Sequence, residues 1–312
     1  MTPALVVVGS LNMDFVVSVE TLPAPGQTVL GHDFQMIPGG KGANQACAAA
    51  RLAGLALNVR MVGRVGYDLF GDHLKASLSA AGVDVSAVHA TRSQPTGVAL
   101  IWVERGGQNS IVVAPGANHA LLASEIEGFR SSFQQARFAL FQLEVPLATT
   151  EAALRLARRE GATTILDPAP ARPLSPALLE LVDILTPNES EALILLQRPP
   201  GRVSAAEAAE LARMLRGMGA RSVVIKLGDQ GCYYDDGAQQ LHQPAFPVTV
   251  RDATAAGDTF NAALAVALAE GQPVERALRF ANAAAALSVT RLGAQASVPT
   301  REEVETFLSQ AS

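Results

Sequence analysis

The segment Asp252–Asn261 places small residues and a carboxylate at the expected start of a helix. Apolar residues recur at i and i+4 after it, which indicates that a helix follows. Ala255, Ala256 and Gly257 leave the first N–H groups of that helix open to an anion, and the helix dipole adds to the attraction. Asp258 follows in the first turn, where its carboxylate could accept a proton from a hydroxyl. The segment therefore predicts phosphoryl transfer, with Ala255–Gly257 as an anion hole and Asp258 as the base.

A purely structural interpretation of Asp258 is also open. The helix dipole stabilises an aspartate near a helix N-terminus by ~0.3–1 kcal/mol, which explains the carboxylate but not the three small residues before it. The dipole also favours the ionised form, so we expect Asp258 to be a weak base. Phosphoryl transfer tolerates a weak base, because in its loose transition state the hydroxyl proton need not leave early.

A second glycine-rich segment, Gly39–Asn44, precedes an alanine-rich stretch that predicts a helix over 44–52. Its glycines permit close backbone approach, and the helix start offers unpaired N–H groups. The spacing differs from that of a Walker A loop. Lys41 and Asn44 add donors that suit sugar hydroxyls. A tight turn before a helix is the alternative, and it is the better explanation of this segment taken alone.

Two further segments could border a nucleotide. Asn188 and Glu191 are three residues apart, so they share a helix face and could hold Mg²⁺, in part through water. An N-cap followed by an acidic first turn is the better explanation of these two residues taken alone. Lys226–Gly231 follows a strand-like run and could also lie beside a nucleotide. A turn between two strands is the alternative.

Strand-like and helix-like segments alternate along most of the chain. This alternation predicts an α/β fold with a doubly wound, mainly parallel sheet and helices on both faces. Capping boxes predict helix starts at Ser124, Ser204 and Thr300, each followed three residues later by a glutamate. The expected strands are 5–8, 59–62, 138–143, 163–166 and 222–225, and the expected helices include 69–80 and 147–159.

Two pairs of strand-like segments interrupt this alternation. The first pair is 15–19 with 28–36, and the second is 98–103 with 110–114, which flanks the expected hairpin turn Glu104–Asn109. They predict a small antiparallel sheet, built from segments 13–37 and 96–115 and attached to a single domain over residues 1–312. Such a sheet could act as a lid that keeps water from competing with the acceptor.

Composition narrows the class of protein. Nearly half of the 312 residues are apolar and 17% are charged, which favours a large buried core. The net charge of −5 argues against general nucleic-acid binding, although a local basic pocket for phosphates remains compatible with it. Cys47 and Cys232 are far apart and form no disulfide framework, which predicts a cytoplasmic protein. No apolar run is long enough to cross a membrane.

Taken in order, these segments resemble the ribokinase/PfkB carbohydrate kinase family from Gly9–Asp14 to Arg291–Pro299. The family signatures correspond to Gly39–Asn44 and Asp252–Asn261, with Asn188–Glu191 between them. The resemblance implies ATP-dependent phosphorylation of D-ribose at the 5-hydroxyl, giving D-ribose 5-phosphate and ADP. It also implies Mg²⁺, a monovalent cation such as K⁺, and a homodimer formed through the lid sheet.

The resemblance further assigns roles to individual residues. Asp258 corresponds to the base and Ala255, Ala256 and Gly257 to the anion hole, while Glu191 corresponds to the acidic residue linked to Mg²⁺. The residues that correspond to sugar contacts are Asn12, Asp14, Gly40, Lys41, Gly42, Asn44 and Glu144. Those that correspond to nucleotide contacts are Asn188, Lys226, Gly228, Gly231, Gly257 and Asn282. Those that correspond to the K⁺ shell, partly through carbonyls, are Asp252, Thr254, Ser288, Arg291, Gly293 and Ser297.

Three positions depart from the family pattern without removing the chemistry. Lys226 stands where threonine is common, Asn282 where histidine is common, and Thr254 where an apolar residue is usual. Asn12, Asp14 and Glu144 together favour a polyhydroxylated pentose over deoxyribose, fructose or a nucleoside, because unpaired polar groups penalise a substrate that lacks the matching hydroxyl. A kinase for one of those other substrates is the nearest alternative. A non-catalytic sugar-binding relative is a further one.

Overall fold

The computed structural model describes residues 2–106 and 108–311 and contains two sheets. The larger sheet has nine strands among these residues, in the order β13-β12-β11-β10-β9-β8-β1-β4-β5. Seven neighbouring strands pair in parallel, in the order β11, β10, β9, β8, β1, β4 and β5, while β12 and β13 extend the sheet as antiparallel strands. The strands are β1 (Ala4–Val8), β4 (Asn58–Gly66), β5 (Asp84–Thr91), β8 (Ala136–Phe141), β9 (Thr163–Leu166), β10 (Ile184–Leu185), β11 (Ser222–Lys226), β12 (Cys232–Asp235) and β13 (Gln240–Gln243).

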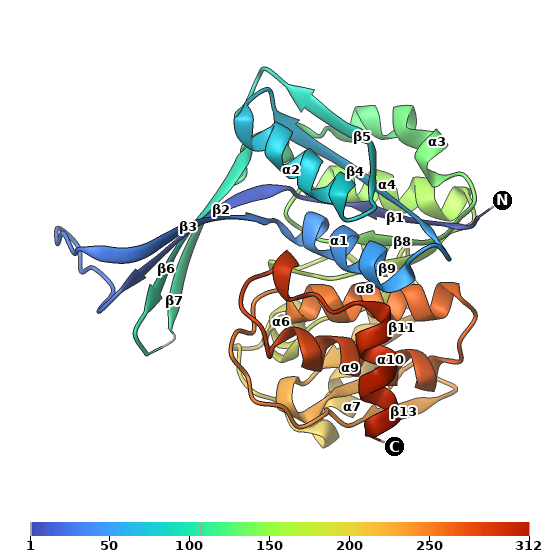
Figure 1. Ribbon diagram of the computed structural model, residues 1–312. Coiled ribbons are helices and arrows are strands. Elements are labelled where there is room, and N and C mark those ends of the chain that lie inside the picture. The colour runs from blue at the N-terminus through green and yellow to red at the C-terminus, as the bar shows by residue number, and fades with distance from the viewer. Residues whose placement is uncertain (1, 107, 312) are drawn as a thin grey trace.

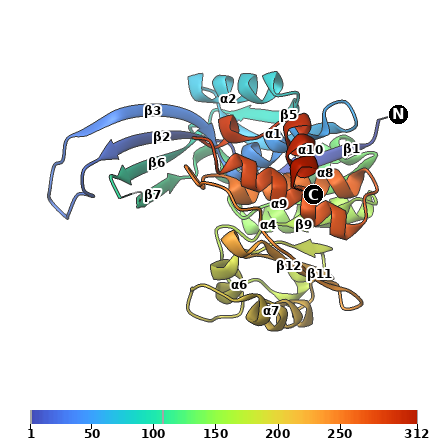
Figure 2. The same ribbon diagram turned by 60° about the horizontal axis from the view of Figure 1, so that its bottom comes forward.

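Helices cover both faces of this sheet (Figures 1 and 2). One layer holds α1 (Lys41–Ala53), α2 (Leu69–Ala80), α8 (Ala256–Ala269), α9 (Val274–Ser288) and α10 (Arg301–Gln310). The other holds α3 (Arg130–Phe133), α4 (Leu147–Arg159), α5 (Pro176–Leu179), α6 (Glu189–Leu195) and α7 (Ala205–Gly217). Short 3₁₀ helices occupy Gly116–Ala120, Ala123–Phe129, Gly228–Gln230 and Gln295–Ser297.

Strand β1 is apolar throughout because it is buried on both faces of the sheet. Leu5 and Val7 pack into the core under α1 and α8, while Val6 and Val8 pack into the core under α4. A strand buried on both faces needs no polar alternation, which is the pattern of a covered parallel sheet. The predicted doubly wound α/β fold is thus confirmed.

The direction in which the chain winds fixes where a site can form. From β1 the chain proceeds outward to β4 and β5, then returns to β8 on the other side of β1 and continues to β9, β10 and β11. The carboxyl ends of β1 and β8 therefore lie at a topological switch point, where open α/β sheets leave a crevice.

The smaller sheet contains β2 (Asn12–Val19), β3 (Gly31–Gly39), β6 (Gly97–Glu104) and β7 (Asn109–Ala114) and projects from the body of the molecule (Figure 1). β2 pairs with β3, and β6 with β7, in antiparallel fashion, as expected. The expectation of a wholly antiparallel sheet was wrong, because β2 and β6 join the two pairs in parallel. In the expected turn between β6 and β7, Gly107 lies outside the described residues.

Two of the three expected helix starts are confirmed. The hydroxyls of Ser204 and Thr300 accept hydrogen bonds from the backbone N–H groups of Glu207 and Glu303, each at 3.3 Å. The expectation for Ser124 was wrong: a 3₁₀ helix already begins at Ala123, before that residue. Within the described ranges, no helix is both long and apolar enough to cross a membrane.

Candidate active site

The glycine-rich segment brings the N-terminus of α1 against the end of β1. Gly40 has φ 90°, and a Cβ there would lie 2.8 Å from the backbone nitrogen of Asn12. A Cβ on Gly42 would lie 2.6 Å from the backbone nitrogen of Ser10. The backbone N–H of Ala43 donates to the carbonyl of Ser10 at 2.9 Å, which fixes this approach. The glycines thus serve close packing, and the helix start faces the switch point.

Polar side chains from three separate segments meet beside this helix start. Glu144, just beyond β8, accepts hydrogen bonds from the Ser10 hydroxyl at 2.5 Å and from the backbone N–H of Lys41 at 3.1 Å. The amide of Asn118 donates to Asn12 Oδ1 at 2.7 Å, so the Asn12 amide group remains able to donate to a ligand. The sequence had not singled out Ser10 or Asn118, because each acts through another residue rather than through a motif of its own.

Charge is concentrated in the same place. Burial, together with the carboxylates of Glu144 and Asp258, raises the pKa of Asp14 to about 7. Burial opposes the charge of Lys41, but nearby carboxylates, above all Asp258 and Asp167, outweigh it and raise the pKa of Lys41. A cation surrounded by carboxylates and amides offers the mixed donors and acceptors that a polyhydroxylated ligand needs.

Asp258 is a deeply buried carboxylate near this cluster, with 5% of its surface exposed. It accepts hydrogen bonds from the amide of Asn44 at 3.1 Å and from the amide of Gln45 at 3.0 Å. Burial raises the pKa of Asp258 to about 6, although Lys41 opposes this change. The expectation of a weak base was therefore wrong: desolvation outweighs the helix dipole, and Asp258 is a better proton acceptor than an exposed aspartate.

The start of α8 forms an opening for an anion beside Asp258. Ala255 adopts the left-handed conformation, with φ 58°, immediately before the helix. The N–H of Ala256 turns back to the carbonyl of Ala253 at 3.3 Å, so it contributes less to the opening than expected. Within the part of the chain that the structure describes, the N–H groups of Gly257 and Asp258 meet no backbone or side-chain acceptor. The N–H of Ala255 likewise meets no acceptor among the described residues, so all three groups are free donors at the helix start.

Three buried residues near Asp258 had not been assigned a role from the sequence: Gln45, Gln142 and Asp167. The Gln45 amide donates both to Asp258 and, at 3.1 Å, to Asp167, which follows β9. Gln142 donates in turn to Gln45 at 2.6 Å. Asp167 stands at the carboxyl end of a parallel strand, which was the available signal, but only the fold places it near Asp258.

Near the start of α8, the structure brings Asn188, Glu191 and Lys226 together. Asn188 caps α6 by accepting from the Glu191 N–H at 2.8 Å, and Glu191 Oε2 accepts from the Asn188 N–H at 2.7 Å. This is the capping arrangement that the sequence left open as an alternative. Burial raises the pKa of Glu191, while Lys226 lowers it. Glu191 Oε1 takes no part in the capping box and could reach a water-coordinated cation.

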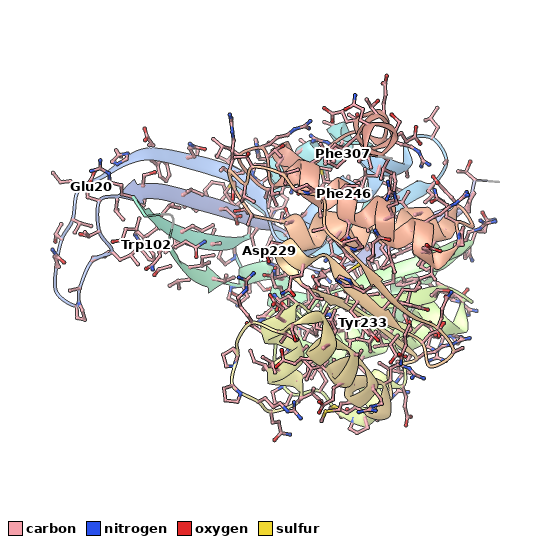
Figure 3. All side chains as sticks on the ribbon, turned by 90° about the horizontal axis from the view of Figure 1, so that it is seen from below. Glu20, Trp102, Asp229, Tyr233, Phe246 and Phe307 are labelled. Carbon is pink, nitrogen blue, oxygen red and sulfur yellow. The ribbon has the colours of Figure 1, made fainter. Side chains whose placement is uncertain are left out.

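Gly228, Gly231 and Asn282 lie around the adjoining edge of the sheet. Gly228 and Gly231 have φ 57° and 93° in the turn that joins β11 to β12, so the expected turn between strands is present. The Asn282 amide donates to the carbonyls of Gln243 and Pro244 at 3.1 and 3.2 Å, which ties α9 to the segment after β13. Figure 3 shows the nearby rings of Phe246 and Phe307, whose centroids are 5.2 Å apart.

The candidate cation shell connects two loops before and after the helix pair α8–α9. Asp252 accepts from the N–H groups of Thr254 and Gly293 at 2.9 and 2.8 Å, and these bonds contribute to lowering the pKa of Asp252 despite its partial burial. The hydroxyls of Ser288 and Ser297 donate to backbone carbonyls at 2.8 Å, which leaves their oxygen lone pairs free. An ionised carboxylate with neutral oxygens suits a hard monovalent cation.

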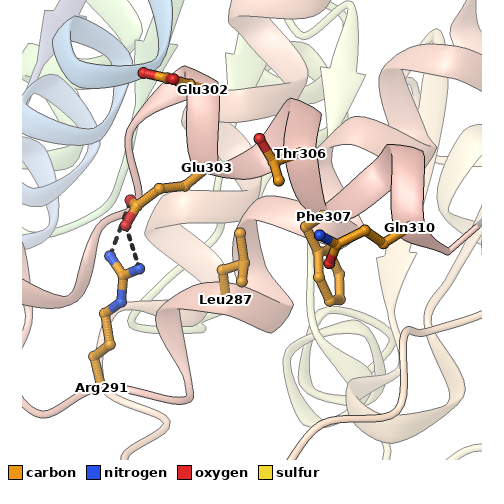
Figure 4. Close-up of a pocket in the computed structure, with 7 residues that line it drawn as sticks. All are labelled: Leu287, Arg291, Glu302, Glu303, Thr306, Phe307 and Gln310. Carbon is orange, nitrogen blue, oxygen red and sulfur yellow. Dashed lines mark hydrogen bonds and ion pairs between the residues drawn. The ribbon is translucent and has the colours of Figure 1, made fainter.

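Arg291 could contribute to this candidate shell only through its backbone, because its side chain has another partner. Its guanidinium forms a bidentate pair with Glu303, at 2.6 and 3.1 Å, on the wall of a pocket between α9 and α10 (Figure 4). Residues 2–106 and 108–311 contain no group of three or more His, Cys, Asp or Glu side chains arranged to hold a metal ion.

The doubly wound α/β fold places the buried Asp258 carboxylate beside an open helix start, near the switch point of the sheet. Residues 2–301 match the pfkB family carbohydrate kinases, and the chain belongs to this family. It is 43% identical over 303 residues to the ribokinase of Bacillus subtilis, covering 97% of this chain and 98% of that protein. It is 40% identical over 313 residues to the ribokinase of Haemophilus influenzae, and both chains are covered in full. The structure of Arabidopsis thaliana ribokinase complexed with ribose and ATP has a TM-score of 0.89 and 36% identity, and the match covers 99% of each chain.

Proposed function

We propose that this chain transfers the γ-phosphoryl group of ATP to the 5-hydroxyl of D-ribose. One observation carries the proposal: the buried Asp258 carboxylate lies beside the free N–H groups of Gly257 and Asp258 and is hydrogen-bonded to Asn44 of the sugar-side cluster. The identities to curated ribokinases support the choice of ribose. The related Arabidopsis structure, which holds ribose and ATP, supports the choice of both substrates.

The chemistry follows from this arrangement. Asp258 accepts the proton of the 5-hydroxyl as that oxygen bonds to the γ-phosphorus, and the bond from phosphorus to the bridging oxygen breaks to release ADP. The N–H groups at the α8 start stabilise negative charge on the transferring group. Asn12, Asp14, Lys41, Asn44 and Glu144 orient the sugar, with Gly40 and Gly42 allowing the close approach of the backbone.

Mg²⁺ would accompany the nucleotide and neutralise phosphate charge. Glu191 fits an indirect contact, since one of its oxygens is used in the capping box and the other is not. Mg²⁺ keeps several waters when bound, so one carboxylate reached through water suffices. Asn188, Lys226, Gly228, Gly231 and Asn282 would border the nucleotide, and K⁺ would occupy the shell around Asp252.

We also propose a homodimer formed through the smaller sheet, which would act as the lid of each subunit. Met36, Leu100 and Val112 lie in one row across β3, β6 and β7 and are 56%, 42% and 55% exposed. Trp102 and Glu20 mark the part of this sheet that is distant from the body (Figure 3). An apolar row of this kind on a projecting sheet suits burial against a second copy. Cys47 and Cys232, both buried and free, suit a cytoplasmic location.

A substrate panel tests the reaction. Initial rates with ribose, deoxyribose, fructose and adenosine would be measured by ADP release, with the phosphorylated position identified by NMR. We expect the highest kcat/KM for ribose and phosphate at position 5. A poor rate with ribose would refute the choice of sugar, and background phosphorylation with ribose still bound would indicate a non-catalytic binder.

A further inference from the structure

A second buried carboxylate, Asp167, shares a hydrogen-bond donor with the base. Asp167 is 3% exposed and lies just beyond β9. Its Oδ2 accepts from Gln45 Nε2 at 3.1 Å, and the same nitrogen donates to Asp258 Oδ1 at 3.0 Å. Gln45 is fully buried, and its Oε1 accepts a hydrogen bond from Gln142 Nε2 at 2.6 Å. One fixed amide group therefore sets the relative position of the two carboxylates.

The other oxygen of Asp167 holds a cation over the anion hole. Lys226 Nζ donates to Asp167 Oδ1 at 2.9 Å, and the Lys226 side chain is only 13% exposed. The same nitrogen lies 3.3 Å from the position that a Cβ on Gly257 would occupy. Because Gly257 has no side chain, the ammonium faces the helix start, where the N–H groups of Gly257 and Asp258 are free.

A structural ion pair would not require this location. Burying a lysine and an aspartate has a desolvation penalty that their attraction repays only with good geometry, so such a pair is weak evidence for a stabilising role. An ammonium has three donors, and Asp167 receives one of them. The remaining donors are available to an anion at the start of α8.

We propose that Lys226 is a catalytic residue that binds the transferring phosphoryl group, and that Asp167 is the positioning residue that holds both its ammonium and, through Gln45, the base. The inference rests on the proposed kinase reaction. Asp167 keeps Lys226 in place before the nucleotide binds. The developing charge on the phosphoryl oxygens then shares the ammonium with Asp167, adding a cation to the backbone N–H groups.

The pair also sets the protonation of Asp258. Asp167 raises the pKa of Asp258, and Lys226 neutralises Asp167 at 2.9 Å. Removing only Lys226 should move the acidic limb of the kcat profile to higher pH, whereas removing only the charge of Asp167 should move it to lower pH. The other charged groups that face this site are Asp14 on β2, Lys41 on α1, Glu144 after β8 and Glu191 on α6.

The test uses the full chain with Lys226→Met, with Asp167→Asn and with both substitutions together. The double variant leaves no unpaired buried charge, so it can still be measured if Lys226→Met alone folds poorly. Circular dichroism would verify folding, and kcat would be measured from pH 5 to 9 at saturating ribose and ATP. We expect the double variant to keep an acidic limb close to that of the unmodified protein but to lose roughly 10²-fold in kcat, the usual effect of removing one donor to a developing charge.

Two outcomes would overturn the inference. Recovery of kcat to within about threefold in the folded double variant would show that Lys226 only neutralises Asp167. An increased KM for ATP with unchanged kcat would show that Lys226 binds the phosphates equally strongly in the ground state and in the transition state, so it would not be catalytic. Failure of the proposed function is distinguishable, because the unmodified protein would then not phosphorylate ribose at all.

Discussion

Replacing Asp258 with asparagine should separate activity from stability. The substitution removes the proton acceptor, and loss of a general base costs roughly 10²–10⁴-fold in rate. It also removes a charge that the fold disfavours. Burial raises the pKa of Asp258 from 3.8 to about 6, a difference worth roughly 3 kcal/mol between its two protonation states. The variant should therefore be much less active and more stable.

The raised pKa of Asp258 also determines how the stability of the folded protein changes with pH. The folded protein binds the Asp258 proton more tightly than the unfolded chain does, so folding stability falls as pH rises from about 4 to about 6. Above pH 7 the penalty is complete. Asparagine does not ionise, but its amide group faces a donor from Asn44 or Gln45, and a lost hydrogen bond costs about 1 kcal/mol. A net gain of about 2 kcal/mol should remain at pH 8 and shrink to about 0.5 kcal/mol at pH 5, where only about half of the penalty is present.

Urea denaturation at pH 5 and pH 8 would measure the change in unfolding free energy, and coupled ADP release would measure kcat. Asp68→Asn is the matched control, because Asp68 caps α2 and its hydrogen bonds to Thr96 and Gly71 lower its pKa despite some burial. That variant should lose stability at pH 8. A kcat for Asp258→Asn within about threefold of the unmodified protein, or a stability change that is the same at both pH values, would refute the reasoning.

Three further substitutions or exchanges test other parts of the site. Ala255→Gly should raise the free energy of unfolding by about 0.5–1 kcal/mol, because Ala255 has φ 58° and glycine adopts this conformation without strain. The control Ala256→Gly, at a residue inside the helix, should lower the free energy of unfolding. Equal losses of stability in urea denaturation for both variants would contradict the strain at Ala255. Exchange of K⁺ for tetramethylammonium, whose methyl groups keep oxygen ligands away from its charge, should reduce kcat while calorimetry still detects ribose binding. Unchanged kcat would argue against the proposed cation shell around Asp252. The double variant Met36→Ser with Val112→Ser should weaken the proposed dimer in light scattering and raise the KM for ribose. The control Leu55→Ser, at a fully exposed position distant from the lid, should do neither. An unchanged oligomer would exclude the row Met36, Leu100 and Val112 as the interface.

The alternation of strands and helices was readable from the sequence because its signals are local. Helices over 69–80 and 147–159 and the strand over 163–166 have the expected bounds. Apolar runs on buried strands and glycines at close approaches follow from each segment's own burial and backbone freedom. The parallel pairing of β2 with β6 was not readable, since their partners are about 85 residues apart in sequence and strand direction is set by the whole chain.

Asp258, the proposed base, illustrates the same division between local and tertiary information. The sequence alone determined that Asp258 stands at a helix start after three small residues, because that pattern is local. Its proton affinity depends on how deeply the surrounding layers bury it, and on Lys41 and Asp167, which the fold brings to it from distant segments. Only the tertiary structure therefore decided that the pKa of Asp258 is higher than its helix position indicates, and that Gln45 joins it to a second carboxylate. Desolvation and charge interactions depend on distance in space, which the order of residues does not fix.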